Sequence, residues 1–405
     1  MSYFKLTKIN THLCKSNLLV KFHNINHNNN DTNSLVYLNH SLYTYLKSNK
    51  EQIEKNYDKW DIYKKYTNPY EYIHTNYDKH NNISSIKPLS RAYYKMIELI
   101  HKFDLIREFK YKTMNSFHLA EGPGGFIEAF VTMRNNPNDT YYGMTLVNGD
   151  NNAPGWRKSS SFLKNNPNVI IEKGKTQTGD LYSFENLKHI HNTYQDNKFD
   201  IVTGDGGFDF SIDFSKQEVN AFRLIFSQIM FALCLQKNKG KFILKIFDLF
   251  NKSSIDLVYL LTLLYDEVYI TKPKTSRYAN SEKYIVCIGF NNDTFETLKE
   301  KLFKIFIVFE NIDFNTYNVT SLIDKKYNYV FQKEIQEYTS IIGQQQLNNI
   351  NHTLLLIKNP NMNKIEQTKK HNIIKCIEWC KEHNIPYKPY KKTNIFKTLD
   401  NRNSK

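Results

Sequence analysis

The chain has 405 residues, 40% of them hydrophobic, which is enough to bury a full-sized core and indicates a globular protein. Lysine and arginine outnumber aspartate and glutamate by 55 to 40, and the net charge of +15 favours a polyanionic partner such as nucleic acid over a merely solvated basic surface. Five scattered cysteines exclude a disulfide scaffold, and without an apolar run of signal-peptide or membrane-spanning length we expect a soluble intracellular protein.

Residues 1–60 predict an N-terminal extension. The asparagine-rich stretch at 23–30 is typical of a low-complexity loop, and helical periodicity follows from Ser34 to about Lys65. The segment Asn68-Pro69-Tyr70-Glu71 ends this periodicity. A second helix is predicted to begin near Leu89 and to continue through Ile100.

A glycine-rich stretch follows an apolar run that ends at Ala120, and it leads into the apolar start of a helix at Ile127: Glu121-Gly122-Pro123-Gly124-Gly125-Phe126. In α/β proteins, such a turn between a strand and a helix lets the backbone approach a dinucleotide or an adenosyl cofactor. An ordinary strand-to-helix turn fits the same residues. The glycines are too closely spaced for the dinucleotide fingerprint, and the lack of a following Gly-Lys-Ser/Thr argues against a nucleotide triphosphatase.

Apolar runs then alternate with helical patterns, at 181–194 and 219–235, in the βαβ manner that predicts a mainly parallel sheet. With the run at 117–120, about seven strands are predicted. The other six are Thr140–Leu146, Val169–Glu172, Phe199–Thr203, Lys241–Phe247, Glu267–Thr271 and Tyr284–Phe290. The expected fold class is α/β, a Rossmann-like three-layer sandwich over residues 61–292.

Residues 293–405 predict a mostly helical region with a basic tail. The periodicity indicates a helix at Phe295–Val308, a pair of helices within Lys333–Ile357 and a last helix at Ile373–Glu382. Cys376 and Cys380 are one helical turn apart near His383, but a fourth metal ligand is not evident. Ordinary helix packing is therefore the better interpretation of these two cysteines.

Charged residues occupy strand ends where a core would favour apolar ones. Asp205 follows one strand, Lys245 lies inside a six-residue apolar run, and Glu282 precedes the last strand. A buried lysine is costly unless it is paired. Lys245 is either an edge lysine that reaches water beside Asp248, or part of a charged site with Asp205 and Glu282 at the carboxyl edge of the sheet.

The chain resembles the FtsJ-type ribose 2′-O-methyltransferases in a Lys-Asp-Lys-Glu tetrad, here Lys95, Asp205, Lys245 and Glu282. It is most similar to the eukaryotic and large-DNA-virus enzymes that methylate the first transcribed nucleotide of capped mRNA, through the segments Asn68–Glu71, Arg91–Lys95, Gly143–Leu146, Asp205–Phe208, Lys245–Phe250, Lys272–Arg277 and Asn280–Tyr284. The resemblance covers roughly residues 60 to 290.

This resemblance implies S-adenosylmethionine as the methyl donor, Lys245 as the general base for a ribose 2′-hydroxyl, and no required metal. Repulsion by Lys95 would favour the neutral form of Lys245, while Asp205 and Glu282 would hold both amines in place. The implied cofactor contacts are Asp180 and Leu181 near the adenine, together with the loop residues Ala120, Glu121, Gly122, Pro123, Gly124, Gly125 and Phe126. Asp180 also fits a helix N-cap.

Lys64, Lys65 and Arg277 would flank the site as RNA contacts, and Phe208 or Tyr278 could stack on a base, although each also fits a solvated surface. The implied substrate is capped mRNA, converted from cap 0 to cap 1 beside other capping or transcription proteins. The expected place is the cytoplasm or nucleus, or a viral factory or virion, since the composition fits a large DNA virus or a protist. Alternatives are a ribosomal or transfer RNA ribose methyltransferase and a catalytically silent RNA-binding subunit.

Overall fold

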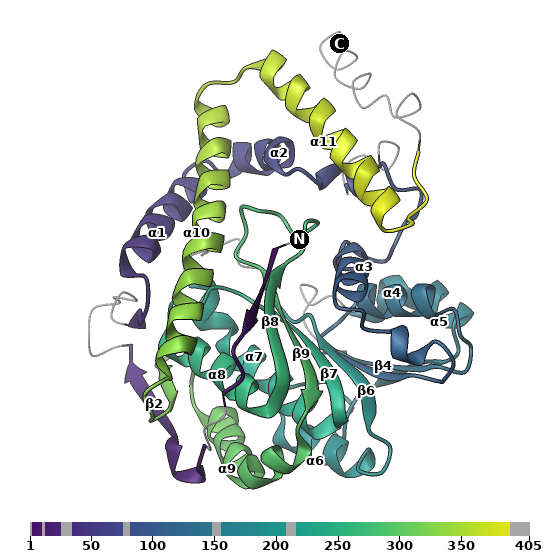
Figure 1. Ribbon diagram of the computed structural model, residues 1–405, viewed down its shortest axis with the longest axis vertical. Coiled ribbons are helices and arrows are strands. Elements are labelled where there is room, and N and C mark those ends of the chain that lie inside the picture. The colour runs from purple at the N-terminus through teal and green to yellow at the C-terminus, as the bar shows by residue number, and fades with distance from the viewer. Residues whose placement is uncertain are drawn as a thin grey trace.

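An eight-stranded sheet in the order β1-β8-β9-β7-β6-β3-β4-β5 forms the centre of the computed structural model (Figure 1). The structure describes residues 2–9, 13–25, 35–75, 82–147, 155–207 and 216–388. The strands are β1 Ser2–Leu6, β2 Leu18–Asn24, β3 Asn115–Leu119, β4 Thr140–Met144, β5 Val169–Glu172, β6 Phe199–Gly204, β7 Gln236–Ile246, β8 Tyr265–Lys272, β9 Lys283–Phe290 and β10 Tyr317–Ile323. The α-helices are α1 His40–Glu54, α2 Tyr57–Thr67, α3 Ala92–Lys102, α4 Gly125–Arg134, α5 Ser160–Asn165, α6 Phe184–Thr193, α7 Gln217–Leu235, α8 Lys252–Leu264, α9 Asn292–Asn311, α10 Tyr329–Lys358 and α11 Met362–Glu382.

Six strands of the central sheet run in the same direction. β3 to β7 pair in parallel, and β8 shares their direction because both β7 and β8 pair antiparallel with β9. The expected α/β class with a mostly parallel sheet is therefore confirmed. The eighth strand is β1, which pairs antiparallel with the outer edge of β8.

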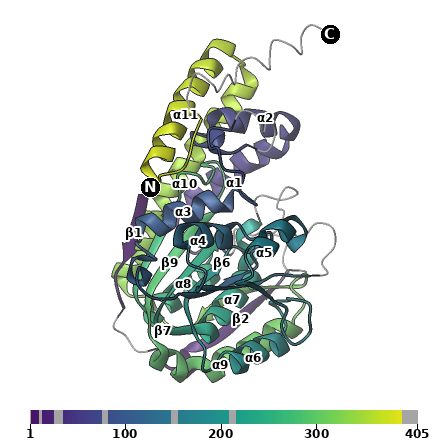
Figure 2. The same cartoon turned by 90° about the vertical axis from the view of Figure 1, so that its right-hand side faces the viewer.

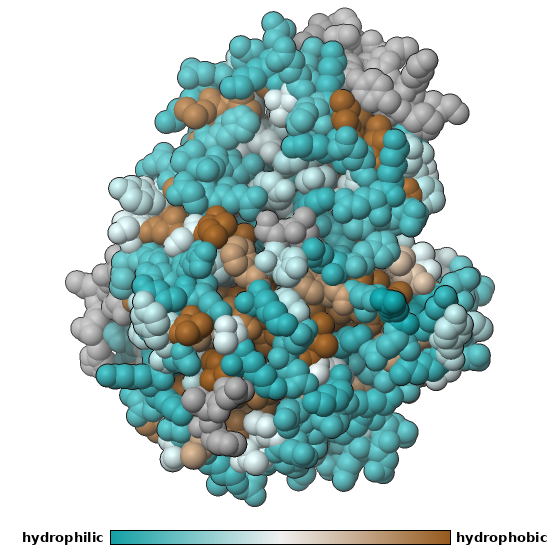
Figure 3. Space-filling model, viewed as in Figure 1, coloured by the Kyte–Doolittle hydropathy of each residue, from teal (hydrophilic) through white to brown (hydrophobic). Residues whose placement is uncertain are grey.

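Side chains from both faces of the sheet are buried, which is why the strands are near-continuous apolar runs. On β7, Phe242 and Leu244 belong to one hydrophobic cluster, formed with α6, α7, α8 and α9, whereas Ile243 belongs to the cluster formed with α3 and α4. The helical layers can be followed in Figures 1 and 2. In Figure 3 hydrophobic residues gather over the middle of the face shown, with hydrophilic residues above and below them.

The expectation that no segment is long and apolar enough to span a membrane is wrong for helix α7. Its 19 residues are apolar enough, by length and composition, to cross a membrane, although no such window was expected. However, 78% of that window is buried inside the protein. Phe226, Met230 and Cys234 on this helix pack in the same cluster as the sheet residues Phe242 and Leu244, which is the environment of a core helix.

The terminal regions contain strands as well as helices. β2 and β10, from the two ends of the chain, form an antiparallel pair. The predicted helix pair at 333–357 is one helix, α10, because Gly343 does not interrupt it: a Cβ atom there would lie 2.6 Å from Leu42 Cδ2, so the glycine lets α1 approach closely. Helices α2 and α11 lie beyond the end of the sheet that carries the β8–β9 loop, and α10 runs from beside the sheet up to them (Figure 1).

Candidate active site

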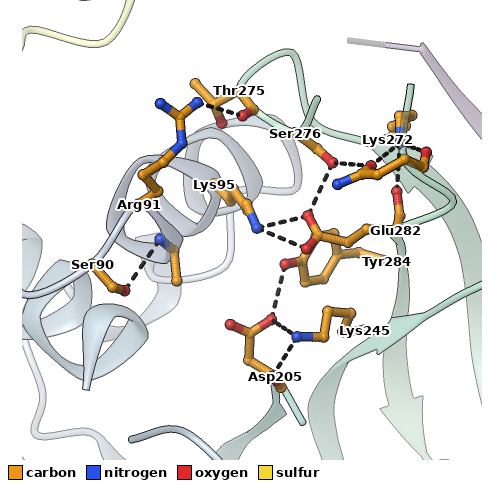
Figure 4. A network of polar contacts seen from close by, with 12 residues as sticks. Ser90, Arg91, Lys95, Asp205, Lys245, Lys272, Thr275, Ser276, Glu282 and Tyr284 are labelled. Carbon is orange, nitrogen blue, oxygen red and sulfur yellow. Dashed lines mark hydrogen bonds and ion pairs between the residues drawn. The ribbon is translucent and has the colours of Figure 1, made fainter. Parts of the chain in front are cut away.

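Four ionisable side chains form two ion pairs at the carboxyl edge of β6 and β7 (Figure 4). Lys245 Nζ lies 3.3 Å from Asp205 Oδ1 and also donates a 2.6 Å hydrogen bond to the Asp205 carbonyl oxygen. Lys95 Nζ, from α3, lies 2.7 and 2.8 Å from the two carboxylate oxygens of Glu282. Each of the four side chains is at most 14% exposed. The structure thus brings together the four residues that the sequence singled out.

The carboxylate of Glu282 is held ionised. Burial alone would raise its pKa, but attraction by Lys95 and then Lys245 outweighs burial and lowers the pKa to about 2. Ser276 from the β8–β9 loop donates a 2.9 Å hydrogen bond to Glu282 Oε1. Glu282 therefore remains negative at neutral pH and fixes the position of the Lys95 amine.

The alternative interpretation of Lys245, an edge lysine beside Asp248, is wrong. Asp248 instead lies 2.6 Å from Lys283 Nζ and 3.0 Å from Lys50 Nζ. These two lysines outweigh the effect of burial and hold the pKa of Asp248 well below its usual range. The carboxylate that faces Lys245 is that of Asp205.

Tyr284 is a member of the site whose role the sequence did not predict. Its hydroxyl donates a 2.9 Å hydrogen bond to Asp205 Oδ1. Tyr284 is the cross-strand partner of Lys245 in the antiparallel pairing of β7 with β9. The signal that could have identified it is this register, because directly paired residues place their side chains on the same face of a sheet.

The glycine loop that follows β3 takes an unusual backbone path. Gly124 has φ +101°, a conformation that L residues rarely adopt, and α4 begins at the next residue. The Glu121 carboxyl group accepts hydrogen bonds from the backbone amides of Phe126, at 2.6 Å, and Ile127, at 3.3 Å. Burial nevertheless raises its pKa well above the usual range. Because the Glu121 carboxyl group is bonded to the first amides of α4, the backbone is the part of Glu121 that remains for contact with a ligand.

Two glycines directly after Asp205, Gly206 and Gly207, form a turn beside Lys245. A Cβ atom on Gly207 would lie 3.0 Å from Lys245 Nζ, closer than ordinary van der Waals contact. The Gly206 amide donates a 2.9 Å hydrogen bond to Gln228 Oε1 from α7, which fixes this turn. Phe208, the predicted stacking residue, lies outside the described residues.

Asp180 lies in the turn between β5 and α6. Its Oδ1 accepts a 2.8 Å hydrogen bond from the Tyr182 amide. The N-cap of α6 is Ser183, whose hydroxyl accepts from the Asn186 amide, so the interpretation of Asp180 as the helix N-cap is wrong. Gly179 before it has φ +67° and lies against the Thr145 carbonyl, where a Cβ atom would clash. This glycine brings Asp180 close to the end of β4.

A cavity of about 200 Å³ lies between the helices α1, α2 and α10 and the β8–β9 loop, the loop that ends at Glu282. The residues that line it are Lys50, Ile53, Trp60, Lys64, Asn68, Gln217, Arg277, Ala279, Asn280, Ser281, Gln346 and Asn349. Two of the predicted RNA contacts, Lys64 and Arg277, thus line this cavity. Both are already paired, Lys64 with Asp61 and Arg277 with Glu71. Lys65 is not among the described residues that line the cavity.

Lys272 binds the last residues of the β8–β9 loop through hydrogen bonds. Its amine donates hydrogen bonds to the Glu282 carbonyl oxygen at 2.7 Å and to the carbonyl and side-chain oxygens of Asn280 at 2.8 and 2.9 Å. Burial, and then repulsion by Lys283, lowers its pKa to about 7. Lys272 therefore holds the end of the loop that carries Glu282.

The chain is similar in sequence to known methyltransferases. A sequence model of the family described as FtsJ-like methyltransferase matches residues 88–290. A Drosophila melanogaster protein named cap-specific mRNA (nucleoside-2′-O-)-methyltransferase 2 is 29% identical over 236 residues, which cover 52% of this chain and 32% of that protein. Cap-specific mRNA (nucleoside-2′-O-)-methyltransferase 1 of Trypanosoma cruzi is 36% identical over 172 residues, or 42% of this chain and 46% of that protein.

A third relative is named as inactive. The inactive cap-specific mRNA (nucleoside-2′-O-)-methyltransferase 1B of Caenorhabditis briggsae is 27% identical over 235 residues, which cover 56% of this chain and 27% of that protein. The chain thus spans between about a quarter and a half of the length of these three relatives.

Proposed function

Because the chain belongs to the FtsJ-like methyltransferase family, we propose that it transfers a methyl group from S-adenosylmethionine to the ribose 2′-hydroxyl of a cap-proximal nucleotide of mRNA. The product would be cap 1, formed from cap 0. The observation that carries the proposal is the double ion pair of Lys95 with Glu282 and Lys245 with Asp205 at the carboxyl edge of the sheet. The names of the relatives support the choice of capped mRNA as the substrate.

The spacing of residues along the sheet edge fits an adenosyl donor. In the order β6-β3-β4-β5, Asp205 follows β6, the glycine loop follows β3 and Asp180 lies beyond β5. Three strand spacings amount to about 15 Å, which suits a ligand with its adenine near Asp180 and its reactive end near Lys245. The loop backbone would hold the part between them. S-adenosylmethionine supplies an electrophilic methyl group on its sulfonium.

The protein side of the reaction is alignment and proton removal. The Lys245 amine would take the proton of the ribose 2′-hydroxyl, for which it must first lose its own extra proton to solvent. The Asp205 carbonyl and carboxylate oxygens direct this amine. The missing side chain of Gly207 leaves room for the ribose beside Nζ. The Lys95–Glu282 pair would hold the ribose in line with the methyl group.

The cavity between α1, α2, α10 and the β8–β9 loop would receive the capped end of the RNA. Of the basic residues that line it, Lys50 and Arg277 are held by the buried carboxylates of Asp248 and Glu71, whereas Lys64 pairs with the more exposed Asp61 and could exchange this partner for a phosphate. Ser281 also lines the cavity and directly precedes Glu282, so RNA that enters there lies next to the ion pairs. We infer that the cap occupies the cavity while the first nucleotide reaches Lys245.

Two alternatives follow from specific features. Basic charge alone would also suit a ribosomal or transfer RNA ribose methyltransferase. A silent RNA-binding subunit is the second alternative, because one relative is named as inactive. The complete set of Lys95, Asp205, Lys245 and Glu282 argues against a silent subunit.

The proposal is tested by methyl transfer from labelled S-adenosylmethionine to three RNAs of one sequence, bearing an N7-methylated cap, an unmethylated cap or a 5′-triphosphate. We expect transfer to capped RNA well above that to the triphosphate RNA. Equal transfer to all three would favour the ribosomal or transfer RNA alternative, and no transfer with measurable RNA binding would favour the silent subunit.

A further inference from the structure

Glu71 is a buried carboxylate that lies between two arginines. Its side chain is 2% exposed. Arg277 donates to it in a bidentate manner, from Nε to Oε2 at 2.9 Å and from Nη2 to Oε1 at 2.8 Å. Asn68 donates a further 2.7 Å hydrogen bond to Oε2. Bidentate arginine pairs of this kind fix direction as well as distance.

The second arginine, Arg91, connects Glu71 to the helix that carries Lys95. Arg91 Nη1 lies 3.6 Å from Glu71 Oε1, and Arg91 directly precedes α3. The same guanidinium donates to the backbone carbonyl oxygens of Glu71 and His74 and to that of Thr275, the last of which Figure 4 shows. Arg91 therefore links the start of α3 to the segment of Glu71 and to the β8–β9 loop.

Arg277 connects Glu71 to the loop that carries Glu282. This loop, 273–282, also contains Ser276, which donates to Glu282. Consequently, Arg91–Glu71–Arg277 joins α3 to the β8–β9 loop, and so does Lys95–Glu282. Because both sets of ion pairs join the same two elements, the Arg91–Glu71–Arg277 set helps to keep Lys95 and Glu282 within ion-pair distance.

We propose that Glu71 is a positioning residue for methyl transfer, which keeps α3 and the β8–β9 loop in the register that places Lys95 on Glu282. The proposal rests on the methyltransferase function proposed above. Without the carboxylate, two largely buried guanidinium groups would face each other uncompensated. Their repulsion would move residues 277–282 of the loop away from α3 and separate Lys95 from Glu282, whereas Lys274 and Thr275 stay bonded to Glu98 of α3. Glu71 would thus act on the reaction without touching the substrate.

The main test is Glu71→Gln in the full chain, assayed on the RNA that the wild type methylates best. A displacement of about 1 Å at the ion pairs can lower the rate about 100-fold. We therefore expect kcat to fall by about that factor, with KM for RNA and Kd for S-adenosylmethionine within about twofold of the wild type. An unchanged kcat, or a loss confined to KM, would overturn the proposal.

The matched control is Asp139→Asn. Asp139 is also a buried carboxylate that pairs with an arginine, Arg134 Nε at 2.6 Å, but it precedes β4 and lies apart from the ion pairs. This variant should lose stability to a similar degree and keep its kcat. A comparable fall of kcat in both variants would show that Glu71 acts merely through stability, and would also overturn the proposal.

Arg277→Gln provides a second variant that is expected to fold, since Glu71 keeps Arg91. It should lower kcat about tenfold at constant KM for RNA. A raised KM at unchanged kcat would make Arg277 an RNA contact and contradict the positioning role.

A crystal structure of the Glu71→Gln protein supplies a readout that needs no activity. We expect the Lys95–Glu282 distance to exceed that of an ion pair, and its persistence at 2.7 Å would contradict the proposal whatever the substrate is. If the wild-type protein methylates no RNA, the proposed function is contradicted, whereas the crystal structure still tests the positioning role of Glu71.

Discussion

Lys245 is the residue whose substitution has the clearest expected effect. Lys245→Ala removes the proposed base but leaves the glycine loop and Asp180 in place. General bases contribute about 10²- to 10⁴-fold, so methyl transfer should fall by at least about 100-fold while Kd for S-adenosylmethionine stays nearly constant. Single-turnover transfer and calorimetric titration of the cofactor would measure the two effects.

Lys239→Ala is the matched control for this prediction. Lys239 lies on the same strand, β7, but it is 63% exposed and pairs with Asp266 at the surface. Its replacement should leave the rate unchanged. Full activity of Lys245→Ala would refute the proposed mechanism.

The ionisable residues of the site were predictable where a charge lies inside an apolar strand or directly after one. Lys245 and Asp205 were visible for this reason, because a buried charge requires a partner. Tyr284 and Glu71 were not assigned roles, because a tyrosine in a strand and a glutamate after a helix are ordinary locally. Their roles depend on the register of β9 with β7 and on contacts between Glu71 and two distant arginines.

At the scale of elements, Glu218 links the start of α7 to the segment that follows β7. Its carboxyl group accepts hydrogen bonds from the amides of Phe250, at 3.1 Å, and Asn251, at 2.9 Å. Burial, the largest cause, raises its pKa from 4.5 to about 7. Between these two values the folded state binds more protons than the unfolded state, so this group makes the free energy of unfolding decrease as pH rises.

Glu218→Gln should therefore flatten the dependence of stability on pH between about 4.5 and 7. The slope removed would approach about 1.4 kcal/mol per pH unit in the middle of this window. Urea denaturation of both proteins at several pH values measures the slope. Parallel curves for the two proteins would show that Glu218 titrates normally in the folded state.

Asp256 joins helix α8 to strand β10. Its Oδ2 accepts from the Leu322 amide at 2.7 Å and the Ile323 amide at 3.1 Å, and its Oδ1 lies 2.8 Å from Lys252 Nζ. Asp256→Ala leaves these two amides without the carboxylate and Lys252 without its ion-pair partner, so the free energy of unfolding should fall by about 3 kcal/mol. Denaturant titration checks this, and a loss below about 1 kcal/mol would mean that water replaces these contacts.

The central strands were predictable as elements, and the peripheral ones were not. Tyr284–Phe290 was predicted within one residue of the bounds that β9 has, because a strand buried on both faces is an unbroken apolar run. By contrast, β1, β2 and β10 are stabilised by pairing with segments far away in sequence, which local patterns do not report. The same reason explains why β10 was missed within a region that was expected to be mostly helical, and why β2 was missed where a loop was expected from residue 23 onward.

At the scale of the molecule, both terminal regions take part in the fold around the site. β1 extends the central sheet, and Lys50 of α1 pairs with Asp248 behind the cavity. We propose that residues 61–292 form the catalytic unit, while the flanking regions complete the cavity for the capped end. Helices α1, α2 and α10 line it from outside that unit or at its border.

The net charge of +15 predicts that RNA affinity depends strongly on salt. The logarithm of the association constant should fall linearly with the logarithm of salt concentration, by about 0.7 for each phosphate neutralised on single-stranded RNA. Fluorescence anisotropy at several KCl concentrations measures this slope, with an uncharged peptide nucleic acid as the control. A slope near zero would show that the basic surface is merely solvated.

The most direct test of the account is the identity of the methylated position. Capped RNA is incubated with the protein and labelled S-adenosylmethionine, digested with a nuclease that leaves the cap attached to the first nucleotide, and analysed by mass spectrometry. We predict the label on the ribose 2′-oxygen of a cap-proximal nucleotide in the wild type, and its loss in Lys245→Ala. Label on a base, on the cap guanine or at internal nucleotides would contradict the account.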